Sequence, residues 1–166
     1  MSTQLFFAAL FVFPVAFAVI SDARWMRIPN WITAVLAAAF VPFAAVTLEL
    51  REAALHVLIA GLLFGAMIYP FVNNWMGAGD VKLTAAAALW AGPTSVVPML
   101  VAISFAGCAL ATIVWLYWRA LEARHADLQL TFPMKQLAHW GRIGRVPYGI
   151  AIGIGALAVV PRIFFS

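Results

Sequence analysis

The stretch that decides the fold is residues 54–72, ALHVLIAGLLFGAMIYPFV, which contains no Asp, Glu, Lys or Arg. A helix needs about 20 apolar residues to cross a hydrocarbon core about 30 Å thick, and this run has that length and composition. The rest of the chain has the same character, since 66% of its 166 residues are hydrophobic and 10% are charged. Such usage excludes an ordinary soluble domain. It predicts an all-α, polytopic membrane protein that forms a single domain over residues 1–166.

Polar or Pro/Gly-rich segments divide the apolar residues into about six runs. We expect transmembrane helices near residues 4–21, 31–48, 54–72, 81–92, 95–118 and 147–164. The fourth run ends at Gly92-Pro93 and is short for a full crossing. In the polar stretch 119–146, apolar residues alternate with basic ones. Two interpretations of this stretch stay open, an amphipathic segment on the inner leaflet and a solvated loop.

The basic residues indicate an orientation, because Lys and Arg concentrate on the cytoplasmic side of membrane proteins. Eight of the ten lie in segments 21–30, 73–82 and 119–146, which share one side, whereas Arg51 and Arg162 lie on the other. The basic residues nearest the first run follow it, which is the reverse of the charge order in a signal peptide. We therefore expect a retained first helix with its N-terminus outside the membrane.

Two of the six acidic residues, Asp22 and Asp80, lie beside Gly-, Pro- or Asn-rich motifs at helix ends on the same predicted side. Two carboxylates in a low-dielectric site share a proton, so one activates water while the other protonates the substrate. This is the chemistry of peptide hydrolysis. On the residues alone, an alternative stays open in which Asp22 pairs with Arg24 or Arg27 and Asp80 caps the following helix.

The segment before and after Asp80 reads Gly77-Ala78-Gly79-Asp80-Val81-Lys82. Glycines at positions 77 and 79 permit a sharp loop and a close approach of a substrate strand. A phosphate-binding loop is disfavoured, because there is no preceding strand and no GK[ST] ending. Lys82 is better interpreted as a topology and headgroup residue than as a catalytic one.

Three motifs in order resemble the type IV prepilin peptidase family of GxGD aspartyl proteases. They are Asp22 with Ile28-Pro29-Asn30 after five residues, GAGDVKL at Gly77–Leu83, and VPYGIA at Val146–Ala151. The resemblance implies a six-helix enzyme that removes the leader of prepilin or pseudopilin precursors at the cytoplasmic face of the bacterial inner membrane. It implies membrane lipids and no nucleic acid as further partners. It also implies that Asp22 and Asp80 are catalytic. The residues expected in the loop or in contact with substrate are Pro29, Asn30, Gly77, Gly79 and Lys82.

The chain departs from the larger, bifunctional members of that family, which carry CxxC motifs in a cytoplasmic N-terminal region and also methylate the product. It begins at its first helix and has one cysteine, Cys108. We therefore expect a peptidase without methyltransferase activity, similar to the minimal Flp (tight-adherence) type, with small archaeal preflagellin-type peptidases left open. No cofactor or metal is expected, because His56, His125 and His139 lack ligand spacing.

Two other classes of protein remain as alternatives. The first is a small proton- or cation-coupled transporter, in which intramembrane carboxylates bind the ion. The second is a non-catalytic assembly factor of a pilus or secretion machine. The transporter interpretation predicts an inverted repeat and acidic residues spread through the bilayer, and the sequence has neither.

Overall fold

The computed structural model describes residues 2–124, 134–144 and 146–165. Its helices are, in chain order, α1 (Ser2–Trp25), α2 (Asn30–Thr47), α3 (Leu50–Val72), α4 (Ala78–Arg124), α5 (Met134–Ile143), α6 (Tyr148–Ala158) and α7 (Val160–Phe164). The described residues contain no strand, which confirms the all-α prediction. Four helices, α1 to α4, are long and apolar enough to cross a membrane, and α6 is a shorter apolar helix.

The helices extend beyond most of the expected apolar runs. The first run was expected to end near residue 21, but α1 continues to Trp25, so that Asp22 belongs to its last turn. The third was expected from residue 54, but α3 begins at Leu50, after a capping box formed by Glu49 and Glu52. The sixth run is divided between α6 and α7 at Val159. Backbone and capping hydrogen bonds, rather than hydropathy, therefore set these ends.

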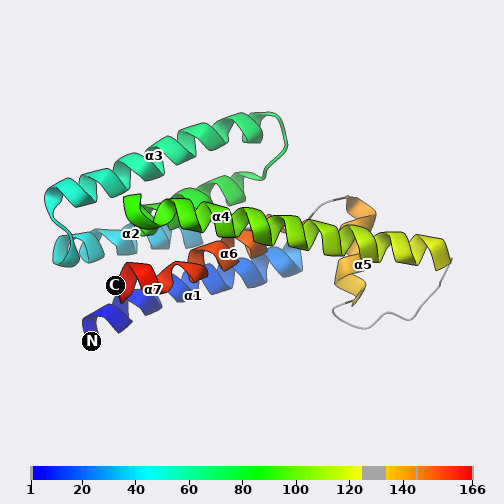
Figure 1. The fold of residues 1–166 in the computed structure, drawn as a ribbon, viewed down its shortest axis with the longest axis horizontal. Helices are drawn as coiled ribbons and strands as arrows, with labels where there is room; N and C mark the ends of the chain where they lie inside the picture. Colours follow the sequence, from blue (N-terminus) through cyan, green and yellow to red (C-terminus); the bar gives the residue numbers. More distant parts are fainter. Residues whose placement is uncertain (1, 125–133, 145, 166) are drawn as a thin grey trace.

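The expected break at Gly92-Pro93 lies inside α4, where the chain doubles back (Figure 1). Gly92 has a φ of 61°, and a Cβ atom there would collide with the imidazole of His56. Pro93 has no N–H to donate to the carbonyl of Leu89, four residues earlier. His56 Nδ1 lies 2.8 Å from that carbonyl oxygen and therefore donates in its place. The carbonyl group that the hinge leaves without its helical partner thus still has a hydrogen bond inside an apolar protein.

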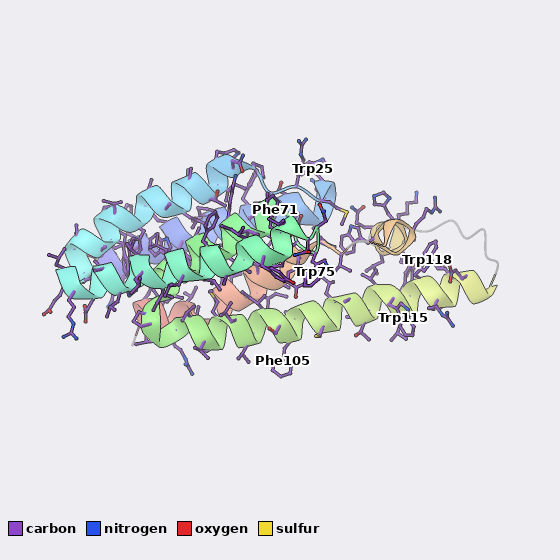
Figure 2. The ribbon with its side chains drawn as sticks, turned by 90° about the horizontal axis from the view of Figure 1, so that it is seen from above. Trp25, Phe71, Trp75, Phe105, Trp115 and Trp118 are labelled. Carbon is purple, nitrogen blue, oxygen red and sulfur yellow. The ribbon has the colours of Figure 1, made fainter. Side chains whose placement is uncertain are left out.

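The second part of α4, residues 93–124, extends well beyond the other long helices, and α5 packs beside its far end (Figures 1 and 2). On α5, Ala138 and Trp140 are buried while Lys135 and Arg142 are exposed. This separation of apolar and basic sides is typical of an amphipathic helix. The amphipathic interpretation of the polar stretch therefore holds for residues 134–143, while residues 125–133 lie outside the described part.

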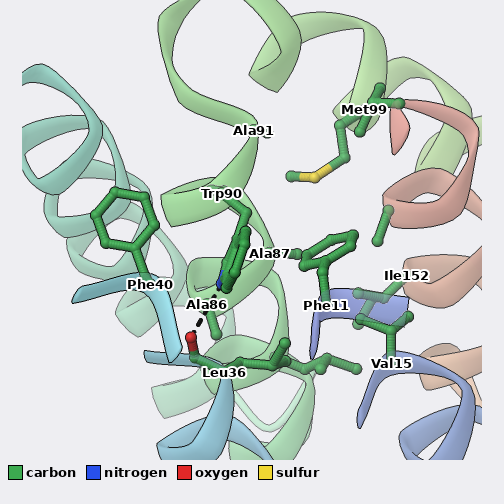
Figure 3. Close-up of a cluster of buried hydrophobic side chains, with 14 of the residues drawn as sticks. Phe11, Val15, Leu36, Phe40, Ala86, Ala87, Trp90, Ala91, Met99 and Ile152 are labelled. Carbon is green, nitrogen blue, oxygen red and sulfur yellow. Dashed lines mark hydrogen bonds between the residues drawn. The ribbon is translucent and has the colours of Figure 1, made fainter. Parts of the chain in front are cut away.

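Bulky aromatic side chains fill the core at the level of the hinge (Figure 3). Trp90 is fully buried, stacks on Phe43 with ring centroids 4.9 Å apart, and packs against Phe11. Its indole Nε1 donates to the carbonyl oxygen of Leu36 at 2.9 Å, so the polar end of the ring is also satisfied. This cluster fixes α1 and α2 against the first part of α4, about 15 Å along the helix from Asp80.

Glycines allow α6 to lie between α1 and the second part of α4. A Cβ atom on Gly153 would collide with Val19 of α1, and one on Gly155 would lie 2.8 Å from the carbonyl oxygen of Met99 on α4. Small residues at helix contacts let backbones approach closely in membrane proteins. The close packing brings the N-terminus of α6 to the end of α1.

Candidate active site

Three helix ends meet at one end of the bundle: the C-terminus of α1 and the N-termini of α4 and α6 (Figure 1). Asp22 lies in the last turn of α1, and Asp80 is the third residue of α4. The carboxylate of Asp22 lies close enough to that of Asp80 to act on it electrostatically. The structure therefore brings together two aspartates that are 58 positions apart in the sequence.

Asp22 is held by the start of α6. Its side chain is only 5% exposed, and its Oδ2 accepts a hydrogen bond of 2.8 Å from the backbone N–H of Gly149. Gly149 is the second residue of α6, where N–H groups have no partner within the helix. A Cβ atom at this position would lie 2.8 Å from the same oxygen, so only glycine permits this contact without displacement.

Asp80 is held by its own loop and is half-buried. Its Oδ2 accepts a hydrogen bond of 3.3 Å from the N–H of Gly77, the residue before α4. A Cβ atom on Gly79 would lie 3.0 Å from Cβ of Ile28, so the glycine-rich loop packs tightly against the segment that joins α1 to α2. Both glycines serve close contacts, and neither has a positive φ.

The turn after α1 fixes the backbone near Asp22. Met26 has a φ of 49°, and its N–H donates to the carbonyl oxygen of Asp22 at 2.8 Å, which closes the helix with a left-handed residue. Ser21 is buried, and its hydroxyl donates to the carbonyl oxygen of Arg27 at 2.6 Å. These bonds hold the chain in a tight return towards α2, whose N-cap is Pro29.

Lys82 and Asn30 lie together beside the site. Nζ of Lys82 donates to Oδ1 of Asn30 at 2.9 Å, which joins α4 to the first residue of α2. Both residues line a groove of about 370 Å³ between α2, α3 and α4. The other residues that line it are mostly small: Thr33, Ala34, Ala37, Ala60, Phe64, Ala85, Ala86 and Leu89.

The alternative interpretation, in which Asp22 forms an ion pair and Asp80 caps the following helix, holds only in part. In the part of the chain that the structure describes, neither Arg24 nor Arg27 forms an ion pair with Asp22, and Arg24 lies over the ring of Trp25 instead. Asp80 does cap α4, although from the third position of the helix rather than from the N-cap. A capping role and a chemical role are compatible, because the bond uses one of the two carboxylate oxygens.

The described residues hold no group of three His, Cys, Asp or Glu side chains arranged to bind a metal ion. Of the three histidines considered from the sequence, His56 and His139 are described and His125 lies outside the described residues. His56 contributes to the hinge of α4 rather than to the site.

Sequence reasoning missed two residues that donate hydrogen bonds to the last turn of α1, which contains Asp22. Gly149 lies within the third motif, so its position was marked, but nothing in the motif indicates its bond to a carboxylate. Gln136 on α5 donates its side-chain amide to the carbonyl oxygens of Ala23 at 2.9 Å and Arg24 at 3.4 Å. No motif marks Gln136.

A model of the type IV leader peptidase family matches residues 8–116, which include both aspartates and the GxGD loop. The chain belongs to this family. Neither a curated protein nor a solved structure matches it significantly. This leader peptidase is therefore a helical membrane protein with peptidase function, and its family implies substrates of the prepilin type. The matched region ends before α5 and α6, which complete the surroundings of Asp22.

Proposed function

We propose that this leader peptidase is an aspartyl endopeptidase in which Asp22 and Asp80 are the catalytic pair. The observation that carries the proposal is that these carboxylates, on two separate helices, lie at the same end of the bundle and near enough for their charges to interact. Each is oriented by a backbone N–H, from Gly149 and Gly77 respectively. Burying acidic groups at a helix end in a membrane protein is costly, which favours a functional role over a structural one.

In the proposed reaction, water adds across the scissile peptide bond. The ionised carboxylate takes a proton from water as the oxygen attacks the carbonyl carbon, and the protonated carboxylate donates its proton to the carbonyl oxygen. The resulting tetrahedral intermediate then collapses. The C–N bond breaks as the aspartate that took the proton from water gives it to the leaving amine, and a hydroxyl proton of the intermediate returns to the other aspartate, so that a free carboxylic acid and a free amine are formed. Neither carboxylate performs both steps alone.

We propose that the substrate contacts the loop residues and the groove beside them. Lys82 and Asn30 line the groove, whose other, mostly small side chains allow an apolar helix to approach closely. Asp80 and Lys82 project about 200° apart around α4, because successive residues turn by 100°. We therefore propose that an extended substrate segment passes over exposed Gly77 and Ala78 to reach the aspartates, where glycine leaves room for it.

The remaining assignments are also proposals. The excess of Lys and Arg at the aspartate end supports cleavage at the cytoplasmic face of a bacterial inner membrane, with the N-terminus outside. We also propose an Flp-type prepilin substrate and leader removal without methyl transfer, by residues 1–166 acting as one domain, because the single cysteine, Cys108, leaves no CxxC pair in these residues. No separate observation favours a transporter or an assembly factor.

The proposal predicts that Asp22→Asn and Asp80→Asn each abolish cleavage of a co-expressed pilin precursor, with a loss of at least about a thousandfold. Asparagine has nearly the shape of aspartate but neither accepts nor donates the catalytic proton. Precursor and mature pilin are separated by electrophoresis, and enzyme abundance in the membrane is measured in parallel. Cys108→Ser, on the exposed surface of α4, is the matched control and should cleave normally. Normal processing by either Asp variant contradicts the aspartyl mechanism.

A further inference from the structure

Gln136 on α5 binds the end of α1 that carries Asp22. Its amide Nε2 lies 2.9 Å from the carbonyl oxygen of Ala23 and 3.4 Å from that of Arg24. The last carbonyls of a helix have no N–H partner within that helix. Here they are capped by a side chain 113 positions further along the chain.

The helix that carries Gln136, α5, packs against the second part of α4. Ala138 and Trp140 of the same helix are buried, and a Cβ atom on Gly141 would lie 2.7 Å from Cβ of Trp118 on α4. Such a close approach leaves α5 little freedom to move relative to α4. The amide therefore links the last turn of α1 to a helix that is itself fixed.

Hydrogen bonds from three residues then define where Asp22 lies. Gly149 binds its carboxylate, Met26 closes its turn through the backbone, and Gln136 holds the two residues that follow it. The first two act on Asp22 itself. The third sets the direction in which the last turn of α1 points, and so the direction in which Asp22 faces Asp80.

We propose that Gln136 is a positioning residue for Asp22. This inference rests on the proposed aspartyl mechanism. The hydrogen bonds of Gln136 go to the backbone of α1 and not to either carboxylate, and Gln136 does not line the groove beside Lys82. Its loss therefore lowers the rate of the chemical step and leaves substrate affinity unchanged. The residue lies beyond the region that matches the family model.

The test depends on the need for a donor at position 136. Gln136→Ala removes the side chain, and Gln136→Glu keeps the length but replaces the amide with an acceptor. Gln136→Lys keeps a donor of similar reach, which a helix C-terminus favours. We expect kcat to fall about tenfold in the Ala and Glu variants and to recover in the Lys variant, because one net hydrogen bond holds the turn. KM should stay within about twofold of the unchanged protein.

The measurements use the full-length protein with a pilin precursor, in detergent or liposomes, at matched enzyme abundance and with thermal unfolding recorded for each variant. Lys135→Ala, at the exposed neighbouring position, is the control and should keep both constants. A normal kcat in the Ala variant, equal loss in the Glu and Lys variants, or a raised KM with unchanged kcat overturns the inference.

Asp22→Asn and Asp80→Asn are measured in the same assay. If they still cleave, the aspartyl mechanism itself fails. If they are inactive and Gln136→Ala is not impaired, the mechanism stands and only the positioning role of Gln136 fails.

Discussion

At the scale of single residues, glycine has two different uses in this protein. Gly92 has a backbone conformation that side chains disfavour, with a φ of 61°. Gly149 lies in an ordinary helix, and glycine is needed there because a Cβ atom would lie too close to the carboxylate of Asp22. A methyl group at position 149 therefore acts on the site directly, because the start of α6 has to retreat from the carboxylate.

Gly149→Ala should lower kcat by about tenfold or more, since small displacements of a catalytic group are costly. Gly153→Ala is the control for packing. Its methyl group, one turn further along α6, meets Val19 of α1 rather than Asp22, so we expect a loss of thermal stability and a smaller loss of kcat than in Gly149→Ala. Cleavage kinetics and thermal unfolding are measured for both variants. If both lose kcat equally, general packing of α6 explains the effect, and the contact with Asp22 does not.

The sequence predicts the aspartates better than it predicts what holds them. Asp22 and Asp80 are recognisable because polar groups at the ends of apolar runs need an explanation. The bonds from Gly149 and Gln136 join residues 127 and 113 positions apart, and such pairs leave no periodic or local signal. Only the assembled bundle shows them.

At the scale of helices, the break at Gly92-Pro93 lies where the sequence predicts it, whereas the helix ends do not follow hydropathy. Residues 22–25, which include the charged Asp22 and Arg24, continue α1, because the helix stops only at the left-handed Met26. The capping box of Glu49 and Glu52 likewise starts α3 earlier than its apolar run. Length and apolarity therefore locate each helix, and capping bonds locate its ends.

The groove between α2, α3 and α4 leads to a prediction at the scale of helices. Ala37→Phe should raise KM about tenfold with little change in kcat, because the large ring occupies space proposed for the substrate helix. Ala45→Phe is the control, since Ala45 is exposed on the same helix outside the groove. The measurement is the dependence of cleavage rate on precursor concentration in liposomes. An unchanged KM for Ala37→Phe contradicts substrate binding in the groove.

At the scale of the whole molecule, the orientation in the membrane decides which face holds the aspartates. Leu50 and Asn73 flank the two ends of α3, and both are exposed. In a Cys108→Ala background, a membrane-impermeant thiol reagent should label Leu50→Cys in spheroplasts, whereas Asn73→Cys should need a permeabilised membrane. The reason is the excess of Lys and Arg on the side of Asn73. The opposite pattern would place the aspartates outside and exclude a cytoplasmic leader peptidase.

The link between Asp22 and Gly149 has a consequence for biosynthesis. A ribosome delivers the chain from its N-terminus, so α1 enters the membrane long before the residue that binds its carboxylate has been made. The hydrogen bond at the hinge of α4 differs in this respect. His56 precedes Leu89 in the chain, so it has already been synthesised when Leu89 emerges. The proposed catalytic pair is therefore completed only when nearly the whole chain has emerged. A truncated nascent chain can insert its first helices while it remains unable to cut the precursors that are being synthesised in the same membrane.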